Sequence, residues 1–335
     1  MGWDFSLSRS INAMIKTTPF IVTRMVVYFG IALLYIFATG TGGAVGYGVT
    51  SFGDGEGAGA FYGALFGFAG ASGVLYWLRE YILYVVKAGH IAVLTKLYDN
   101  EPFPEGKGQV TYAKDVVQAK FKEASIMFAV DQLVKGVLKA ITRLLGGIAW
   151  VLPIPGLENL MKLVNSVIRM SLTYVDEIIL AHAIRTNSDN MWAAAREALV
   201  LYGQNYKSFI KNAVWLSLMM WGLTFLIFVV LLAPTFAIMA LIPGDLGFWS
   251  FIIAFILAWS FKAAIIEPIA MFSLMQVFFE KTEGQVPDPE WEARLEKASD
   301  KFRELTKKAR DFVPGFGKDK DKSSDGPDTP APDPA

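Results

Sequence analysis

Long apolar blocks dominate this chain and restrict it to folds that shield them from water. Four blocks are long enough for a helix to cross about 30 Å of hydrocarbon, which takes roughly 20 residues. They run from about Phe20 to Thr39, from Ala58 to Leu78, from Asn212 to Leu241 and from Phe248 to Phe279. Only 19% of the residues are charged, against about a quarter in soluble domains. The sequence therefore predicts an all-α polytopic membrane protein with four clear transmembrane helices.

Two weaker apolar segments between these pairs, Ala124–Leu145 and Leu157–Ile184, predict a central helical hairpin. Each has a polar stripe along one face, since its polar residues recur every three or four positions. The stripes are Asp131, Lys135, Lys139 and Thr142 in the first segment, and Asn165, Arg169, Thr173 and Asp176 in the second. We expect this amphipathic hairpin to span the membrane and make six transmembrane helices. A hairpin lying along the cytoplasmic surface is the open alternative.

The distribution of basic residues predicts the orientation. The three outer loops of the six-helix arrangement contain no Lys or Arg, and they are residues 40–57, 146–157 and 242–248. By contrast, 24 of the 31 basic residues lie in the four inner segments, residues 1–19, 79–123, 185–211 and 280–335. Because Lys and Arg are retained on the cytoplasmic side, we expect both termini in the cytoplasm and the chain in the plasma (inner) membrane.

The predicted organisation has four parts: a cytoplasmic N-terminal segment (1–19), a helical transmembrane domain (20–285), a cytoplasmic amphipathic helix (288–312) and a disordered tail (313–335). Cytoplasmic helices are also expected near residues 79–123 and 188–205, the second lying at the inner membrane interface. The helix 288–312 has a heptad seam of Trp291, Leu295, Ala298, Phe302, Leu305, Ala309 and Phe312. This seam either associates with a second copy or a cytoplasmic partner, or docks along the protein's own cytoplasmic face.

Small residues at four-residue intervals mark the second apolar block. Gly55, Gly59, Gly63, Gly67 and Ala71 follow one another along one helix face. Such spacing lets two helix backbones approach closely in lipid. We therefore expect tight packing against a neighbouring helix, with a flexible gate as the alternative.

The sequence contains none of the residue patterns that carry common enzymatic chemistry. No H-E-x-x-H, G-x-S-x-G or phosphate-binding glycine loop occurs. There are no cysteines and only two histidines, and the net charge is zero. We therefore expect no enzymatic activity, no cofactor or metal, and no nucleic-acid partner.

Charged residues within the predicted helices are the candidate functional residues, because charges inside a membrane are expensive and often mark solute pathways. The candidate polar pathway comprises Asp131, Lys135, Arg169, Asp176, Lys262 and Glu267. Asp131 and Arg169 are expected to form a buried pair across the hairpin. The stripe spacing selects Asp176 rather than its neighbour Glu177. A structural ion pair is the alternative role for Asp176.

The last apolar block has a predicted kink. Pro268 lacks a backbone donor, so the carbonyl of Ala264 should be left free. Lys262 and Glu267 lie beside this position, and broken helices expose polar backbone in some transporters. Alternatively, Lys262 extends to the cytoplasmic interface and keeps its amine in water.

One stretch resembles a known family. Ala195-Arg196-Glu197-Ala198-Leu199-Val200-Leu201-Tyr202-Gly203-Gln204-Asn205 is similar to the A-R-x-A-x-x-L-x-x-x-N stretch before the penultimate span of choline-transporter-like proteins. The order of elements over residues 79–285 is also similar, although this chain lacks that family's large extracellular loop and full span count. The resemblance implies passage of an organic cation such as choline or ethanolamine. The chain also resembles uncharacterised bacterial multi-pass membrane proteins.

We therefore expect a transporter or channel-like protein for a small solute, a small organic cation such as choline, or a lipid headgroup. The competing hypothesis is a non-catalytic membrane scaffold that recruits cytoplasmic partners through residues 288–312. Under either hypothesis the expected partners of the protein include the lipid bilayer. A second copy of the chain is a further expected partner, through the heptad seam.

The predicted topology can be tested with single cysteines, because the chain has none of its own. An impermeant thiol reagent applied to intact cells should label Thr50→Cys and Gly244→Cys but not Ser323→Cys. If Ser323→Cys were labelled and Thr50→Cys were not, the orientation would be the opposite of the predicted one.

Overall fold

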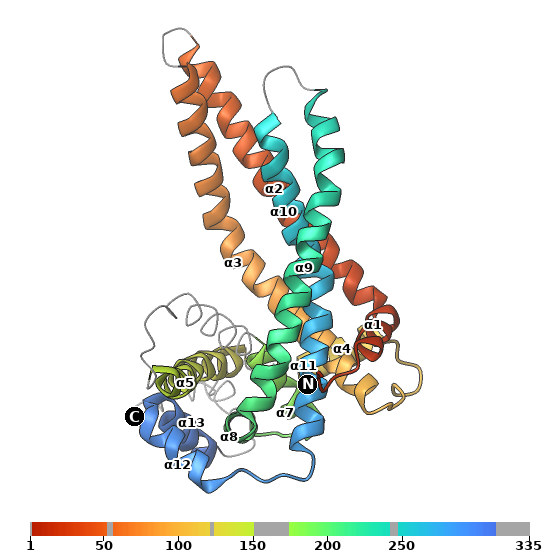
Figure 1. Ribbon diagram of the computed structural model, residues 1–335, viewed down its shortest axis with the longest axis vertical. Coiled ribbons are helices and arrows are strands. Elements are labelled where there is room, and N and C mark those ends of the chain that lie inside the picture. The colour runs from red at the N-terminus through yellow and green to blue at the C-terminus, as the bar shows by residue number, and fades with distance from the viewer. Residues whose placement is uncertain (1, 52–55, 121–123, 151–173, 242–246, 313–335) are drawn as a thin grey trace, which may run out of the picture.

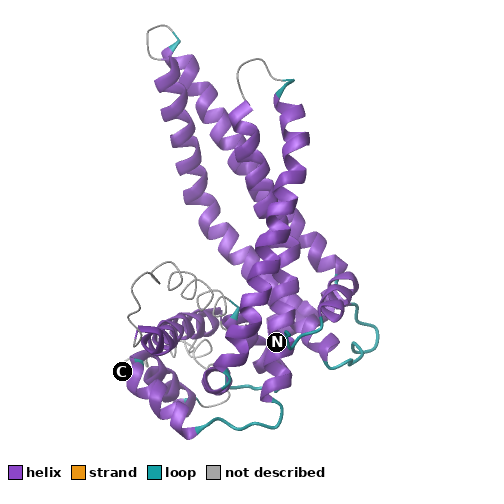
Figure 2. Cartoon of the chain, viewed as in Figure 1, coloured by secondary structure: helices purple, strands orange, loops and turns teal. Residues whose placement is uncertain are grey.

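The computed structural model describes residues 2–51, 56–120, 124–150, 174–241 and 247–312, and within these ranges the chain is helical with no strand (Figures 1 and 2). The elements are α1 (Leu7–Lys16), α2 (Thr18–Thr50), α3 (Glu56–Tyr98), α4 (Gln109–Lys120), α5 (Ala124–Trp150), α7 (Val175–Arg185), α8 (Met191–Gln204), α9 (Tyr206–Met239), α10 (Gly247–Phe261), a π-turn η1 (Lys262–Ile266), α11 (Glu267–Thr282), α12 (Pro289–Ala298) and α13 (Asp300–Asp311). The all-α fold class is thus confirmed.

Two helical hairpins rise from a broad helical base (Figure 1). One arm pairs α2 with α3, and the other pairs α9 with α10. Three described helices are long and apolar enough to cross a membrane: α2, α9 and the continuous α10–η1–α11. The second helix of the predicted central hairpin falls mainly on residues 151–173, outside the described residues.

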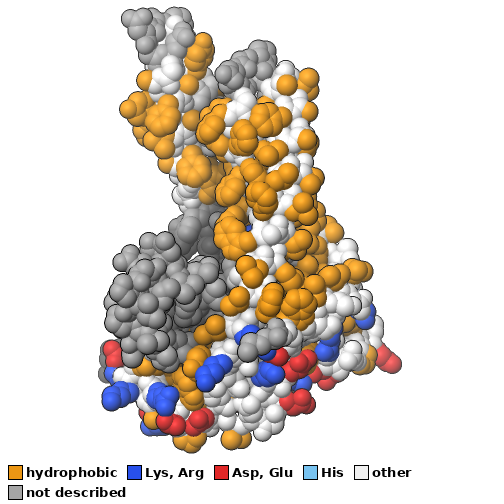
Figure 3. Space-filling model, viewed as in Figure 1, with side chains coloured by type: hydrophobic (Ala, Val, Ile, Leu, Met, Phe, Trp, Pro, Cys, Tyr) orange, Lys and Arg blue, Asp and Glu red, His pale blue; other side chains and the backbone are white. Residues whose placement is uncertain are grey.

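Side chains sort by polarity along the long axis. On the face shown in Figure 3, hydrophobic side chains cover the arms, while Lys, Arg, Asp and Glu gather at the base. Large apolar side chains on the arms are exposed, such as Phe37, Phe66 and Phe225, at 72%, 78% and 67%. Apolar surface of this extent marks a membrane or protein contact.

The two helices of the first arm meet through glycine. A Cβ added at Gly63 would lie 2.1 Å from the carbonyl oxygen of Gly42, and one at Gly67 would lie 2.2 Å from that of Ala38. The predicted close packing is therefore confirmed at these glycines, and the neighbouring helix is α2. The predicted loop 40–57 is wrong over most of its length, because α2 continues to Thr50. The glycines in this stretch of α2 let the backbone of α3 approach closely, and they do not form a flexible loop.

The base has its own apolar core, centred on α8. Ala195, Leu199 and Val200 are fully buried there, among α5, α7, α9, α12 and α13. The helix near 188–205 was predicted correctly, and its apolar stripe faces the protein's own core rather than an open surface. The surrounding helices cover it on several sides, so it is a core helix.

The predicted helix 288–312 is two helices that break at Ser299. Ser299 has an extended backbone, and its hydroxyl accepts a hydrogen bond from the amide of Phe302, which caps α13 and favours a new helix start. The heptad seam docks on the protein itself, since Leu295, Phe302 and Leu305 are fully buried where α12 and α13 contact α5 and α8. The predicted disordered tail lies outside the described residues.

The N-terminal segment is tied to the ends of α9 and α11. The Asp4 carboxylate lies 2.6 Å from Nζ of Lys211 and 3.8 Å from Nζ of Lys281, and it accepts a hydrogen bond from Asn212. Burial opposes its ionisation, but the hydrogen bonds from Lys211 and Asn212 and the lysine charges hold the pKa of Asp4 below its ordinary value. Farther along, Ser10 of α1 hydrogen-bonds Ser273 of α11 at 2.7 Å.

The glycine contact between α2 and α3 predicts a position-specific effect. Gly63→Val would drive a side chain into the backbone of α2, so we expect a loss on the order of 3 kcal/mol of stability. Gly70→Val is the matched control on the same helix, because a Cβ at Gly70 meets nothing within 4 Å. Unfolding in mixed micelles measures both, and equal stabilities would contradict this packing.

Candidate functional site

The site begins with a break in the α10–α11 helix. Pro268 stands one residue after the start of α11, and the turn before it is a π-turn from Lys262 to Ile266. In a π-turn each carbonyl bonds to the amide five residues later, as Lys262 does with Glu267. The carbonyl left without a donor by Pro268 is therefore that of Ala263. The predicted break is confirmed, and the carbonyl that receives a side-chain donor there is that of Ala263, one residue before the expected Ala264.

An ion pair lies across this π-turn. The Nζ atom of Lys262 is 2.7 Å from Oε1 of Glu267, and the two side chains are 9% and 21% exposed. Lys262 also lies 4.6 Å above the ring of Trp259, a cation–π contact. The alternative that Lys262 extends its amine into water is wrong for this conformation, because a carboxylate inside the protein holds it.

A second ion pair joins α3 to α7. Nζ of Lys87 lies 3.3 Å from Oε1 of Glu177, whose side chain is 9% exposed. Asp176 is half-buried and lies beside the Glu177 carboxyl group. The expectation that Asp176 rather than Glu177 faces the polar seam stays a prediction, because Asn165, Arg169 and Thr173 lie outside the described residues. Within the described residues Glu177 is the more buried of the two acids on α7, whose N-cap is Tyr174.

Arg24 of α2 is the third cation, and it is buried more deeply than Lys87, whose side chain is 32% exposed. The Arg24 side chain is 2% exposed. One guanidinium nitrogen, Nη2, donates to the freed carbonyl of Ala263 over 3.4 Å. The other two nitrogens, Nε and Nη1, have no hydrogen-bond partner among the described residues. A guanidinium carries five N–H donors, so most of its bonding capacity is unused.

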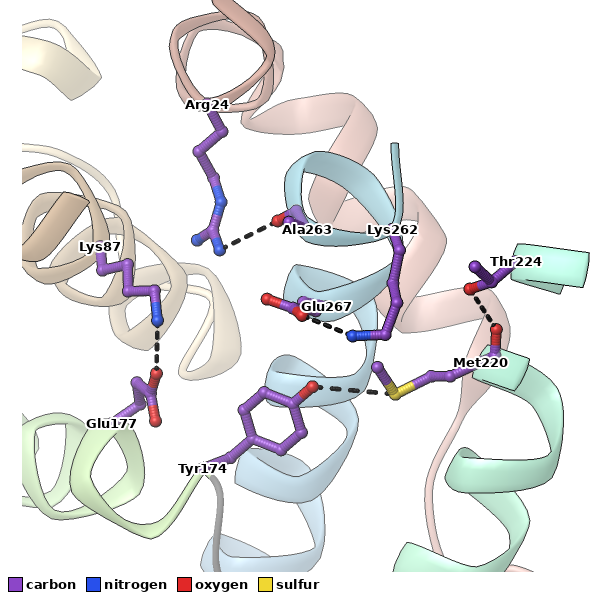
Figure 4. A network of polar contacts seen from close by, with 9 residues as sticks. All are labelled: Arg24, Lys87, Tyr174, Glu177, Met220, Thr224, Lys262, Ala263 and Glu267. Atoms are coloured by element: carbon purple, nitrogen blue, oxygen red, sulfur yellow. Dashed lines mark hydrogen bonds and ion pairs between the residues drawn. The ribbon is translucent and has the colours of Figure 1, made fainter. Parts of the chain in front are cut away.

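These side chains converge from four elements where the arms meet the base. Figure 4 shows Arg24, Lys87, Glu177, Glu267 and Tyr174 pointing toward a common centre. The Tyr174 hydroxyl donates to the sulfur of Met220 at 3.7 Å, which closes the side toward α9. We call Arg24, Lys87, Glu177, Lys262 and Glu267 the buried charge cluster.

The other sequence candidates are placed differently or lie outside the described residues. Lys135 is exposed on α5 and has interactions of its own. The side chain of Asp131 and the whole of Arg169 lie outside the described residues. Their proposed pairing stays a prediction.

Three members of the cluster, Arg24, Lys87 and Glu177, were not among the candidates. Arg24 had a usable signal, because it is a lone charge inside an apolar block, where charge is costly. Lys87 had none, since it falls in a segment of ordinary charge density. Glu177 could be recognised only by knowing where α7 begins.

The cluster is suited to binding a charged solute. The described residues contain no group of three or more metal-ligating side chains. Lys–carboxylate pairs in a poorly hydrated setting can exchange a partner for a charged solute, because the attraction is strong and water does not screen it.

The Lys262–Glu267 pair can be measured by a double-mutant cycle. Lys262→Met alone should cost on the order of 3 kcal/mol of stability, because it leaves a carboxylate buried without its partner. Adding Glu267→Gln should recover much of that loss. The exposed pair Arg294–Glu290, at 54% and 71% exposure, is the control and should couple by about 0–1 kcal/mol. Equal coupling energies in thermal unfolding would show that the cluster is well hydrated.

Comparison with known proteins adds no relative to this description. No protein-family model, curated protein or solved structure matches the chain. What the cluster does must therefore be argued from its own geometry.

Proposed function

We propose that the chain is a transporter or channel-like protein of the plasma (inner) membrane that passes a small solute or lipid headgroup at the buried charge cluster. In this proposal α2, α3, α9 and α10–α11 cross the bilayer, and the base with both termini lies in the cytoplasm. The apolar arms and the charged base in Figure 3 support placing the arms in the bilayer and the base outside it. The absence of Lys and Arg from residues 40–57 and 242–248 supports the cytoplasmic side for the base.

The observation that carries the proposal is the placement of charge at a helix break. Three cations and two carboxylates are gathered around a π-turn in an otherwise apolar helix. Such an arrangement is expensive in a membrane and is found mainly where a solute or ion is handled. Broken helices at solute sites serve the same purpose, because they expose polar backbone groups.

The competing scaffold hypothesis is less well supported. It requires residues 288–312 to offer an apolar surface to a partner. Leu295, Phe302 and Leu305 are instead buried against the protein's own base. A recruited partner would have to bind the charged outer faces of α12 and α13.

Measuring whether water reaches the buried charge cluster distinguishes a solute pathway from a packed core. Ala263→Cys and Ala254→Cys place single thiols at positions with 3% and 0% exposure, and there is no background thiol. A solute pathway opens, so we expect a water-soluble methanethiosulfonate to react at position 263 at least about tenfold faster than at 254.

Solute movement is the second measurement. Proteoliposomes should accumulate labelled choline, the solute that the family resemblance suggests, or labelled phosphate, faster than protein-free liposomes. Glu267→Gln should slow that uptake, while Glu290→Gln on the exposed pair should not. Two equally unreactive thiols together with no uptake of either solute would overturn the proposal.

A further inference from the structure

Arg24 is a buried cation with hydrogen-bond donors to spare. Its side chain is 2% exposed, yet Nε and Nη1 have no partner among the described residues. Its one hydrogen bond there, to the Ala263 carbonyl, is long at 3.4 Å. Leaving donors of a buried charged group unmet costs more than a neutral hydrogen bond gains. A group that completes the guanidinium shell would remove this penalty.

The acids of the buried charge cluster are already engaged. Figure 4 shows Glu177 in an ion pair with Lys87 and Glu267 in an ion pair with Lys262. Asp176 lies beside Glu177, and it has interactions of its own. Within the described part of the cluster, Arg24 is therefore the cation without a carboxylate bonded to it.

The neighbouring histidine does not neutralise Arg24 either. Nε2 of His90 lies 2.9 Å from Oγ1 of Thr17, and that hydroxyl donates its own proton to the Ala13 carbonyl. Nε2–H of His90 is therefore the donor to Thr17. In the neutral ring Nδ1 is then an unprotonated acceptor, and nothing in the described part of the chain donates to it. His90 supplies no negative charge.

We propose that Arg24 is the principal ligand of an oxyanion site, which takes a phosphate group from free phosphate or from a phospholipid headgroup. The planar guanidinium fork matches two phosphate oxygens in a bidentate contact. Lys87 and Lys262 contribute positive potential close by and offset the two carboxylates that they bind. The inference rests on the proposed function and names the solute class handled at the same cluster.

The state of the cluster favours an anion over an organic cation such as choline. A cation site requires a carboxylate or aromatic faces that are free to contact the ligand. Here each carboxylate is paired with a lysine. Oε2 of Glu177 also has no hydrogen-bond partner among the described residues, but that carboxylate already has the Lys87 charge beside it, whereas the unsatisfied donors of Arg24 belong to a cation that no carboxylate in this part of the chain contacts. A bound cation would lie beside Arg24 and be repelled by it.

Ligand-dependent thermal unfolding of the detergent-solubilised full chain tests the site without requiring transport. The probes are sodium phosphate against sodium chloride at equal ionic strength, and short-chain phosphatidic acid against diacylglycerol of equal chain length, which has no phosphate. We expect phosphate, phosphatidic acid or both to raise the unfolding temperature. Stabilisation by phosphate identifies the ligand as a free anion. Stabilisation by phosphatidic acid alone identifies it as a lipid headgroup.

The variants assign the effect to Arg24. Arg24→Met should weaken the apparent affinity for the active probe at least about tenfold, since a charge-assisted pair is lost. Arg24→Lys keeps the charge without the fork and should be intermediate. Lys207→Met, which removes an exposed cation from the start of α9, should bind as the unaltered chain does.

A purely structural role for Arg24 makes a different prediction. If Arg24 serves only to hold the Ala263 carbonyl, Arg24→Met lowers the unfolding temperature equally with and without the anion. The proposal expects Arg24→Met without anion to be at least as stable as the unaltered chain. The proposal is overturned if neither anion stabilises the protein. It is also overturned if Arg24→Met keeps the full anion-dependent rise in unfolding temperature. Should Arg24→Met not fold, Arg24→Lys takes its place in this test. Thiol reactivity at position 263 would then still support the proposed function with another solute.

Discussion

A single missing backbone donor organises the centre of this molecule. Pro268 cannot bond the carbonyl five residues before it, and the π-turn makes that carbonyl Ala263. Arg24 from α2 donates to that oxygen, and Lys262 and Glu267 pair across the same turn. The first arm, the last long helix and the base therefore meet at one polar point inside an otherwise apolar contact. Ion pairs there are stronger than on the surface, since less water screens them.

The parts of the fold that could be predicted from sequence are those set by local pattern. Apolar blocks indicated the long helices, Pro268 indicated the break, and the spacing of Gly63 and Gly67 indicated a close helix contact. Helix ends were less predictable, because α2 continues through glycines that usually interrupt helices. At Gly42 and Gly46 the backbone of α3 packs directly on the helix, where only glycine leaves room for it.

The candidate site was predictable only where it is local in sequence. Lys262 and Glu267 lie five residues apart, and both were recognised. Arg24, Lys87 and Glu177 are brought together by contacts between helices distant in the chain, and no spacing rule links them. The difference between Asp176 and Glu177 depends on the residue at which α7 begins, since one position along a helix turns a side chain by about 100°.

The length of α3 gives the first arm a mechanical property. This helix runs without interruption over 43 residues from the tip of the arm to the base, about 65 Å at 1.5 Å per residue. The glycine contact with α2 lies toward the tip, and Lys87 lies toward the opposite end. Ile91 and Leu94, close to Lys87 on the same helix, are buried in the base. One continuous helix therefore connects the apolar tip of the arm mechanically to the Lys87–Glu177 ion pair.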